Sequence, residues 1–210
     1  IHNLPTRYKY GINNLKEYIP VKLLKTRINR LICSYRKYDE VICVSNACKD
    51  RYTEVFNYGK TYDQKLTVLY NALDMEIVGE KGNEKVELKL SPPVFISVTR
   101  FSIEKGVDRI VEASVRLKSE GYDFRVVVVG DGDLLENIKQ RIAEQSLEDV
   151  ITLTGYMPNP YPEIKESDWL ICSSHKESFS LVLIASIFLG TPVITTDCGG
   201  PTEIVDGGKY

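Results

Sequence analysis

The sequence has no long apolar run, and no stretch approaches the roughly 18 consecutive apolar residues that a membrane-spanning helix requires. It shows no signal peptide, which favours a cytoplasmic protein. Because 27 Lys and Arg face 29 Asp and Glu, the formal net charge is only −2, which gives no overall sign of a nucleic-acid-binding protein. The five cysteines include no C-x-x-C pair, which argues against a disulfide framework or a zinc site and favours reduced thiols.

The chain is long and apolar enough to bury a core. Its 210 residues are 43% hydrophobic, and at about 100–200 residues per domain they make one large domain or two partial ones. The chain starts at Ile1 and ends on Lys209 and Tyr210, directly after a glycine pair. We therefore expect a fragment that is cut at both ends.

Positive charge is concentrated at the start of the chain, where residues 1–40 hold nine Lys or Arg against three acidic residues. Apolar side chains recur there every three or four positions from Val21 to Tyr35, which predicts an amphipathic helix after Pro20. Such a basic segment, residues 20–38, can lie at the inner face of a membrane, or it can pack on its own domain with a solvated basic face. Tyrosines interleave with the basic residues, but no nucleic-acid-binding motif accompanies them, so we expect no nucleic-acid partner.

From Asp39 onward, short apolar runs alternate with amphipathic segments, which indicates βαβ units and a parallel sheet. A charged stretch at residues 76–91 has no clear period and resembles a linker, so the expected domains are 1–91 and 92–210. The pattern predicts strands at residues 41–44, 66–69, 94–98, 124–129, 151–153, 169–172 and 193–195, and helices at 45–52, 107–117, 134–142 and 181–189.

Unusual residues follow several of these strands. Arg100 and Lys105 come after the strand at 94–98; they can grip a diphosphate from two sides, or they can be two solvated charges. Gly130-Asp131-Gly132-Asp133 comes after the strand at 124–129 and has three interpretations. A dinucleotide fingerprint lacks its third glycine because Leu135 occupies that place, and a D-x-D metal site is common by chance. We favour a tight turn that lets a ligand approach, with N–H groups facing a phosphate.

Glu177 lies in a serine-rich loop between the strand at 169–172 and the apolar helix at 181–189. Its carboxylate can accept hydrogen bonds from sugar hydroxyls, and the first N–H groups of the helix can hold a phosphate. Alternatively, Glu177 only initiates the helix, and Ser178 or Ser180 is its N-cap. The turn at residues 197–201 also has room for a ligand.

Taken in order, these motifs resemble a known family. Arg100-x4-Lys105, Gly130-Asp131-Gly132, Gly155-Tyr156-Met157, Glu177-Ser-Phe-Ser and the segment from Gly190 to Ile204 are similar to the donor-binding domain of the GT-B retaining glycosyltransferases of family 4. The resemblance is strong over residues 94–208 and weaker over 1–74, which are similar to the end of the acceptor domain. It implies an α/β protein with two Rossmann-like domains and parallel sheets, both incomplete here.

The resemblance also implies roles. Arg100 and Lys105 neutralise the donor diphosphate, Glu177 contacts the transferred sugar, and His2 matches an acceptor-side active-site histidine, although it can be a plain surface residue. The donor-binding positions are Gly130, Gly132, Tyr156, Met157, Ser178, Phe179, Ser180, Leu181, Val182, Gly199 and Gly200. The partners are a nucleotide-sugar donor and a glycan or glycolipid acceptor, with no metal and no other cofactor.

Two positions depart from the family pattern. Ala185 stands where the family has a second Glu that reaches the nucleotide ribose, and Ala72 stands where it usually has Gly. Ala185 favours a rival reading, a non-catalytic GT-B homologue that binds a sugar, a nucleotide or a protein partner. Intact Arg100, Lys105 and Glu177 favour a glycosyltransferase, and Leu135 disfavours a nucleotide-dependent oxidoreductase.

Overall fold

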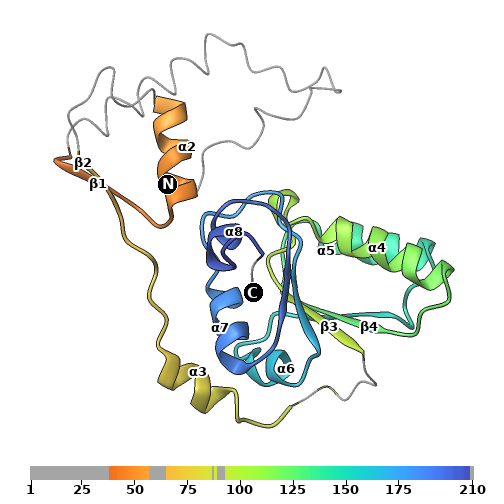
Figure 1. Cartoon of the computed structure of the whole chain (residues 1–210). Coiled ribbons are helices and arrows are strands. Elements are labelled where there is room, and N and C mark those ends of the chain that lie inside the picture. The colour runs from red at the N-terminus through yellow and green to blue at the C-terminus, as the bar shows by residue number, and fades with distance from the viewer. Residues whose placement is uncertain (1–37, 57–64, 87, 89–92, 209–210) are drawn as a thin grey trace, which may run out of the picture. The chain divides into compact units, whose positions relative to one another are not determined.

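The computed structural model describes residues 38–56, 65–86, 88 and 93–208, which fall into two compact units, Ile1–Tyr70 and Asn71–Tyr210 (Figure 1). His2 and all of the basic segment 20–38 except Tyr38 lie outside the described residues. Within the described part of the chain, no helix combines the length and the apolarity needed to cross a membrane.

The first unit contains a parallel βαβ arrangement. Its elements are β1 (Glu40–Cys43), α2 (Asn46–Phe56) and β2 (Lys65–Val68). The two strands pair in parallel with Val41 opposite Leu66, and Val41, Cys43 and Tyr52 form a small buried cluster. The N–H of Cys48 donates to the Ser45 hydroxyl at 3.0 Å, so Ser45 caps this helix as the sequence predicts.

The second unit is a parallel α/β domain, which confirms the fold class. Its strands are β3 (Val94–Val98), β4 (Arg125–Val129), β5 (Ile151–Gly155), β6 (Trp169–Cys172) and β7 (Val193–Thr195), in the sheet order β5-β4-β3-β6-β7 with every pair parallel. Its helices are α3 (Met75–Lys81), α4 (Val107–Ser119), α5 (Leu135–Glu144), α6 (Tyr161–Lys165), α7 (Leu181–Leu189) and α8 (Gly200–Ile204), with a 3₁₀ turn η3 (Ile103–Lys105) before α4. Sequence reasoning missed the two shortest helices, α6 and α8.

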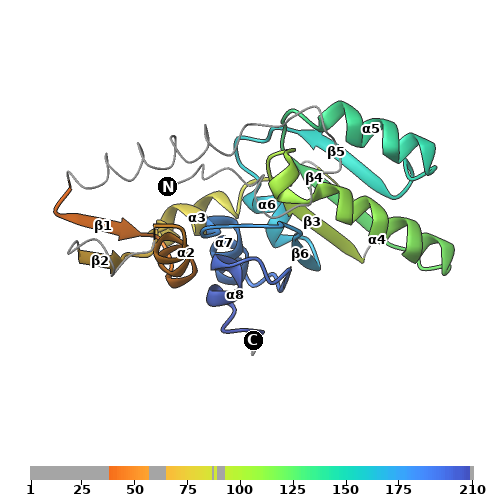
Figure 2. The same cartoon turned by 90° about the horizontal axis from the view of Figure 1, so that it is seen from above.

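Helices cover both faces of this sheet, with α4 and α5 on one face and α6 and α7 on the other (Figure 2). Alternate residues of β4 supply the two cores, because successive side chains of a strand point to opposite faces. Val126 and Val128 pack with α4 and α5, whereas Val127 and Val129 pack with Ile164 of α6. A strand buried on both faces therefore reads as a continuous run of valines.

Part of the expected linker is folded. Asp74 caps α3 by accepting the N–H of Ile77 at 3.1 Å, and the helix packs on α7. Beyond the helix, the Asn159 side chain donates to the Lys81 carbonyl at 3.0 Å. The second unit thus starts earlier in the chain than the expected boundary at 91/92. The sequence hid this helix for three reasons: it has only seven residues, Gly79 within it and Gly82 directly after it break the pattern, and its apolar residues contact another element.

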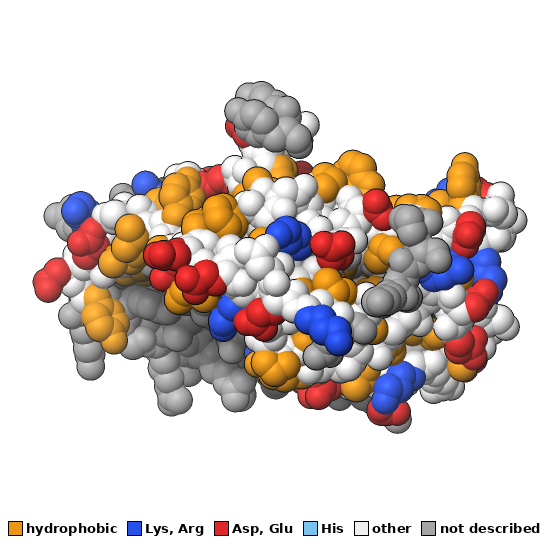
Figure 3. Space-filling model, turned by 90° about the horizontal axis from the view of Figure 1, so that it is seen from below, with side chains coloured by type: hydrophobic (Ala, Val, Ile, Leu, Met, Phe, Trp, Pro, Cys, Tyr) orange, Lys and Arg blue, Asp and Glu red, His pale blue; other side chains and the backbone are white. Residues whose placement is uncertain are grey.

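The molecular surface carries charges of both signs. On the face seen in Figure 3, acidic and basic side chains are interspersed with apolar ones. This distribution agrees with the small net charge of the sequence, −2.

Gly130 marks a place where two loops of the second unit touch. Its φ is +140°, and a Cβ there would lie 1.8 Å from the Thr99 carbonyl oxygen. The loop is fixed by hydrogen bonds as well, since the N–H of Phe101 donates to the Asp131 carbonyl at 3.0 Å and that of Leu134 to the Phe101 carbonyl at 3.0 Å. The turn after β4 therefore packs directly on the loop after β3.

Replacing Gly130 with Ala should be strongly destabilising, because the methyl group would overlap a backbone carbonyl that cannot rotate away. We expect a loss of about 3 kcal/mol or more, the sum of an unfavourable φ and overpacking. Gly121→Ala is the matched control: its φ is +84° and its Cβ would meet nothing within 4 Å. The control should lose only about 1–2 kcal/mol. Urea unfolding of both variants measures the difference, and equal losses would show that the loop contact is loose.

Candidate functional site

The expected site residues gather at the carboxyl edge of the sheet in the second unit. The chain turns from β3 toward β4 and β5 in one direction and later adds β6 and β7 in the other, so β3 and β6 are neighbours with crossovers on opposite faces. This is a topological switch point, where open α/β sheets leave a crevice outside the strand ends. The loop after β3 carries Arg100 and Lys105, and the loop after β6 carries Glu177.

Lys105 and Glu177 form an ion pair across these two loops. The Lys105 ammonium donates to Glu177 Oε2, and the two side chains are 26% and 16% exposed. The Arg100 side chain is exposed and makes no ion pair with any residue that the structure describes. Among the described residues, the loop after β3 therefore carries Arg100 without an ion pair and Lys105 paired with the loop after β6.

Backbone contacts hold the two loops against each other. The Ser173 hydroxyl donates to the Lys105 carbonyl at 3.0 Å, and the N–H of His175 donates to the Glu104 carbonyl at 2.8 Å. Gly106, with φ +63°, permits this approach, since a Cβ there would lie 2.4 Å from the Ser173 oxygen. Arg109 Nη1 donates to the same oxygen at 3.3 Å. The positions of Lys105 and Glu177 are thus set by the backbone and not only by their mutual attraction.

A third loop, which follows β7, supports Glu177 from the other side. The N–H of Glu177 donates to the Cys198 carbonyl at 3.0 Å, and the N–H of Gly200 donates to the Glu177 carbonyl at 3.0 Å. Gly199 and Gly200 therefore belong to the site. The main chain of Glu177 bonds to this loop, and its side chain reaches toward the loop after β3.

Two N–H groups of the Gly130–Asp133 turn are occupied within the protein. The N–H of Gly130 donates to the Gly155 carbonyl at 2.8 Å, and that of Gly132 donates to the Asp131 side chain at 2.7 Å. These two N–H groups are therefore not free for a phosphate, and the expectation that N–H groups of this turn face a phosphate stays a prediction for the others. The close approach that the glycines allow is that of the neighbouring loop.

Helix α7 begins directly after the Glu177 loop. The N–H of Leu183 donates to the Ser180 hydroxyl at 3.4 Å, so Ser180 is the N-cap, while the N–H groups of Leu181 and Val182 are the kind that have no acceptor within a helix. Phe179 packs inward at 9% exposed, and Ser178 precedes it in the loop. A helix start is suited to bind an anion, and this one follows the loop whose Glu177 contacts Lys105.

Ala185 lies one turn further along α7 and is only 1% exposed, whereas Leu181 is 38% exposed. Residues four apart share one side of a helix, but here the side passes from solvent into the packed interior within one turn. An acid at position 185 would enter a tightly packed place, where an unpaired carboxylate is strongly destabilising.

Tyr156 and Met157 lie at the other end of the sheet edge, after β5. Tyr156 is 76% exposed, and Met157 packs partly against the core cluster that holds Ile164. Both line a pocket of about 540 Å³ together with residues of 84–88 and 152–163. The pocket includes neither Lys105 nor Glu177, so the expected donor residues form two separate groups.

One protein family matches the segment that carries this geometry. The family described as "Glycosyl transferases group 1" matches residues 79–209, well over half of the chain. The chain belongs to the group 1 glycosyl transferases. The matched segment contains every site residue named above except His2.

Curated relatives carry glycosyltransferase names. The chain is 34% identical over 134 residues, 64% of its length, to N-acetylgalactosamine-N,N'-diacetylbacillosaminyl-diphospho-undecaprenol 4-alpha-N-acetylgalactosaminyltransferase of Campylobacter jejuni. It is 27% identical over 150 residues, 70% of its length, to N-acetyl-alpha-D-glucosaminyl L-malate synthase of Bacillus anthracis. The chain spans only 35% and 39% of these two relatives.

Solved structures show that the fold is of the GT-B type. The pneumococcal O-GlcNAc transferase GtfA, in complex with UDP and GlcNAc, matches with a TM-score of 0.68 at 20% identity, covering 85% of this chain and 34% of GtfA. HepE of Anabaena, in complex with UDP and glucose, matches with a TM-score of 0.69 at 19% identity, covering 86% of this chain and 51% of HepE. The group 1 chain described here therefore spans part of a GT-B fold.

No cluster of metal-binding side chains occurs among the described residues of this glycosyl transferase. Over the described ranges of the chain, no group of three or more His, Cys, Asp or Glu could hold a metal ion. Asp131 uses its carboxylate on the N–H of Gly132 at 2.7 Å, which leaves it poorly placed as half of a D-x-D site.

Sequence reasoning missed two residues that shape the site, Gly106 and Arg109. The signal for Gly106 was present, because a glycine directly before an amphipathic helix indicates a close approach or a positive φ. Arg109 gave no signal: it is one of several polar residues on α4, and only the structure shows that it reaches the carbonyl of Ser173.

The Lys105–Glu177 pair should stabilise the fold more than a surface pair does. Because both side chains are mostly shielded, a double-mutant cycle with Lys105→Met and Glu177→Gln should give a coupling energy of about 1–2 kcal/mol, above the usual range of exposed pairs. The control is the pair of Lys139 and Glu136 on α5, which is 52% and 82% exposed and should couple by about 0.3–0.5 kcal/mol. Denaturant unfolding measures both cycles, and similar couplings would contradict the shielded pair.

Proposed function

We propose that the full-length protein transfers a sugar from a nucleotide-sugar donor to a polysaccharide or lipid-linked acceptor, with retention of configuration at the anomeric carbon. The observation that carries the proposal is the meeting of Lys105 and Glu177 at the switch point between β3 and β6, beside the unpaired Arg100. A cation pair for the diphosphate and a carboxylate for the sugar are then available from two adjacent loops.

Each residue has a defined task in this reaction. When the bond between the anomeric carbon and the phosphate oxygen breaks, the nucleoside diphosphate leaves with an additional negative charge. Arg100 and Lys105 stabilise that charge, the electrostatic contribution that a metal makes elsewhere. The N–H groups at the start of α7 add further donors. A diphosphate that binds Lys105 competes with Glu177 for the ammonium, so the carboxylate becomes available to accept hydrogen bonds from the sugar.

Several matches support the choice of ligands. The solved structures of GtfA and HepE are complexes with UDP and a sugar. The name of the Campylobacter relative includes a diphospho-undecaprenol. A lipid-linked acceptor would also suit peripheral contact of the basic segment 20–38 with an anionic inner membrane face. Tyr156 and Met157, in their own pocket, are proposed to lie near the base of the donor. His2 is proposed to act on the acceptor side.

A second function is favoured by one residue. Ala185 stands where the resemblance implies an acid that reaches the ribose, and α7 carries no other acidic residue. A non-catalytic homologue that binds a sugar, a nucleotide or a protein partner would tolerate this loss. Binding of donor without turnover would support this second function.

Removing either cation should weaken binding of a nucleoside diphosphate. We expect Arg100→Ala and Lys105→Ala each to reduce UDP affinity by about 1.5–3 kcal/mol, the range for hydrogen bonds to charged groups, while uridine binding hardly changes. Calorimetry on the full-length protein measures this, and Lys139→Ala on the exposed surface of α5 is the control. Equal losses for UDP and uridine would show that the two cations only maintain the fold.

The reaction should not require a divalent metal, because Arg100 and Lys105 supply the positive charge. Donor binding and turnover should be unchanged in excess chelator. Activity that disappears in chelator and returns with Mn²⁺ or Mg²⁺ would contradict this assignment and would bring Asp131 and Asp133 back as ligands. The same titration on Asp133→Asn would then locate the site.

A further inference from the structure

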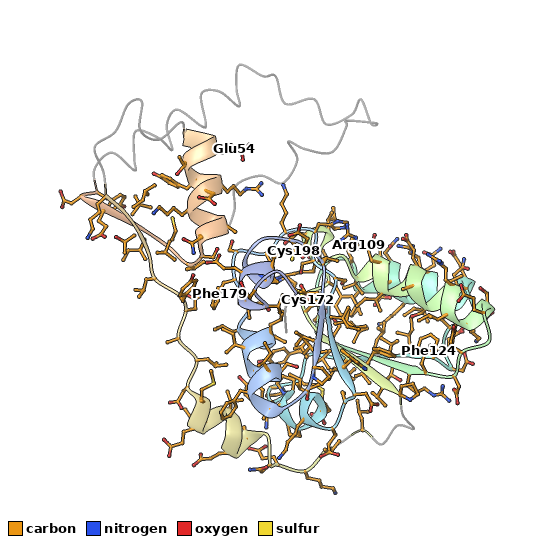
Figure 4. All side chains as sticks on the ribbon, viewed as in Figure 1. Glu54, Arg109, Phe124, Cys172, Phe179 and Cys198 are labelled. Atoms are coloured by element: carbon orange, nitrogen blue, oxygen red, sulfur yellow. The ribbon has the colours of Figure 1, made fainter. Side chains whose placement is uncertain are left out.

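Two cysteines flank the loop that carries Glu177: Cys172 lies at the end of the strand before this loop, and the Cys198 carbonyl accepts the N–H of Glu177. Cys172 ends β6 and pairs in the sheet with Thr195 of β7, and Cys198 lies in the loop that follows β7 (Figure 4). The two segments are joined beyond the strands, since the N–H of Thr196 donates to the Cys172 carbonyl at 3.1 Å and the Thr196 hydroxyl to the Ser174 carbonyl at 2.5 Å. The thiols of Cys172 and Cys198 lie close enough for each to change the pKa of the other.

Neither cysteine is fully buried. The interaction with Cys198 lowers the pKa of Cys172 to about 6 against the opposing effect of burial, and the N–H and hydroxyl of Ser174 add to the lowering. The same interaction, with burial, raises the pKa of Cys198. Cys172 is therefore the thiol of the pair that loses its proton more readily, and the thiolate is the form that attacks disulfides.

We propose that Cys172 and Cys198 form a reversible disulfide that senses the thiol redox state and acts on the Glu177 loop. The oxidant is a small-molecule disulfide. The Cys172 thiolate attacks one of its sulfurs, which forms a mixed disulfide and releases one small thiolate. Cys198 then loses its proton and attacks the Cys172 sulfur, which closes the protein disulfide and releases the second small thiol. The two protein thiols are oxidised and the small disulfide is reduced to two thiols.

The disulfide would move the loop that anchors Glu177. A sulfur–sulfur bond of about 2.05 Å is far shorter than any contact between two thiols, so the Cys198 segment must shift toward the end of β6. The Cys198 carbonyl accepts the N–H of Glu177 at 3.0 Å, and the next loop residues bond to the Glu177 carbonyl. A shift of this segment therefore displaces Glu177 and with it the partner of Lys105. The effect on donor binding rests on the proposed function, whereas disulfide formation does not.

The first unit holds a natural comparison pair. Cys43 and Cys48 also affect each other, but Cys43 is 1% exposed, and burial, the largest cause, raises its pKa to about 11. A buried protonated thiol is a poor nucleophile. If proximity alone decided, both pairs would oxidise. The lowered pKa of Cys172 and the raised pKa of Cys43 instead favour oxidation of the Cys172–Cys198 pair.

Disulfide formation is tested on the full-length protein incubated with oxidised glutathione, followed by alkylation and peptide mass mapping. We expect a peptide pair joined through Cys172 and Cys198, reversed by reduced thiol, while Cys43 and Cys48 stay alkylated. Cys172→Ser should abolish the reaction, and Cys198→Ser should stop at a mixed disulfide on Cys172. No joined peptides, or joining of Cys43 to Cys48 under the same conditions, would overturn the proposal.

The coupling to the site is tested by UDP calorimetry on the reduced and oxidised protein. We expect oxidation to weaken UDP binding about tenfold or more in the wild type and in Cys48→Ser, and to leave Cys172→Ser unchanged. A disulfide that forms without any change in affinity would refute the action on the Glu177 loop. If neither form binds UDP, the proposed function fails, and the mass mapping still decides whether the disulfide exists.

Discussion

The parallel pairing of β3 with β6 is the constraint on which the site depends. Phe95 lies opposite Trp169 and Ile96 opposite Leu170, so the two strands end at the same edge and their loops start side by side. These strands are distant in sequence, with η3, α4, β4, α5, β5 and α6 between them. The helices that follow the two strands, α4 and α7, cover opposite faces of the sheet. No helix therefore lies between the two loops, and they can meet.

Backbone contacts complete what this pairing begins. Residues 99–106, 173–178 and 196–200 exchange hydrogen bonds with one another, and Gly106 allows the first two loops to touch. The Lys105–Glu177 pair is therefore held by a framework that persists when a ligand separates its members. Such preorganisation is what electrostatic catalysis needs, because the charges do not have to be repositioned during the reaction.

Much of the fold could be predicted because its signals are local. The strand Val94–Val98, the helix Leu181–Leu189 and the strand Val193–Thr195 were bounded correctly by apolar runs and by the glycine or serine at their ends. The helix Met75–Lys81 was not predicted, because a seven-residue helix depends on a cap and on packing against α7 rather than on its own periodicity.

The site was predictable only in part. The order of motifs located Arg100, Lys105 and Glu177, but their spacing could not show that Lys105 and Glu177 touch. That contact needs the strand order, which no local pattern contains. The Gly130 turn illustrates the same point: a glycine needed for a ligand and a glycine needed for a neighbouring loop look identical in sequence, and only the structure shows that Gly130 touches the Thr99 carbonyl. Likewise, nothing in the sequence distinguishes the Cys172–Cys198 pair from isolated thiols.

The most direct test of the central claim, that Glu177 and the two cations form a sugar-transfer site, is mass-spectrometric screening of the full-length protein against nucleotide sugars. The account predicts slow hydrolysis of at least one donor, which releases free sugar and nucleoside diphosphate. Glu177→Ala should abolish this hydrolysis, and Glu104→Ala, which changes a neighbouring carboxylate in the loop after β3, should retain it. If nucleotide sugars bind but none is hydrolysed, or if both variants lose activity equally, Glu177 does not act on the transferred sugar and the account is contradicted.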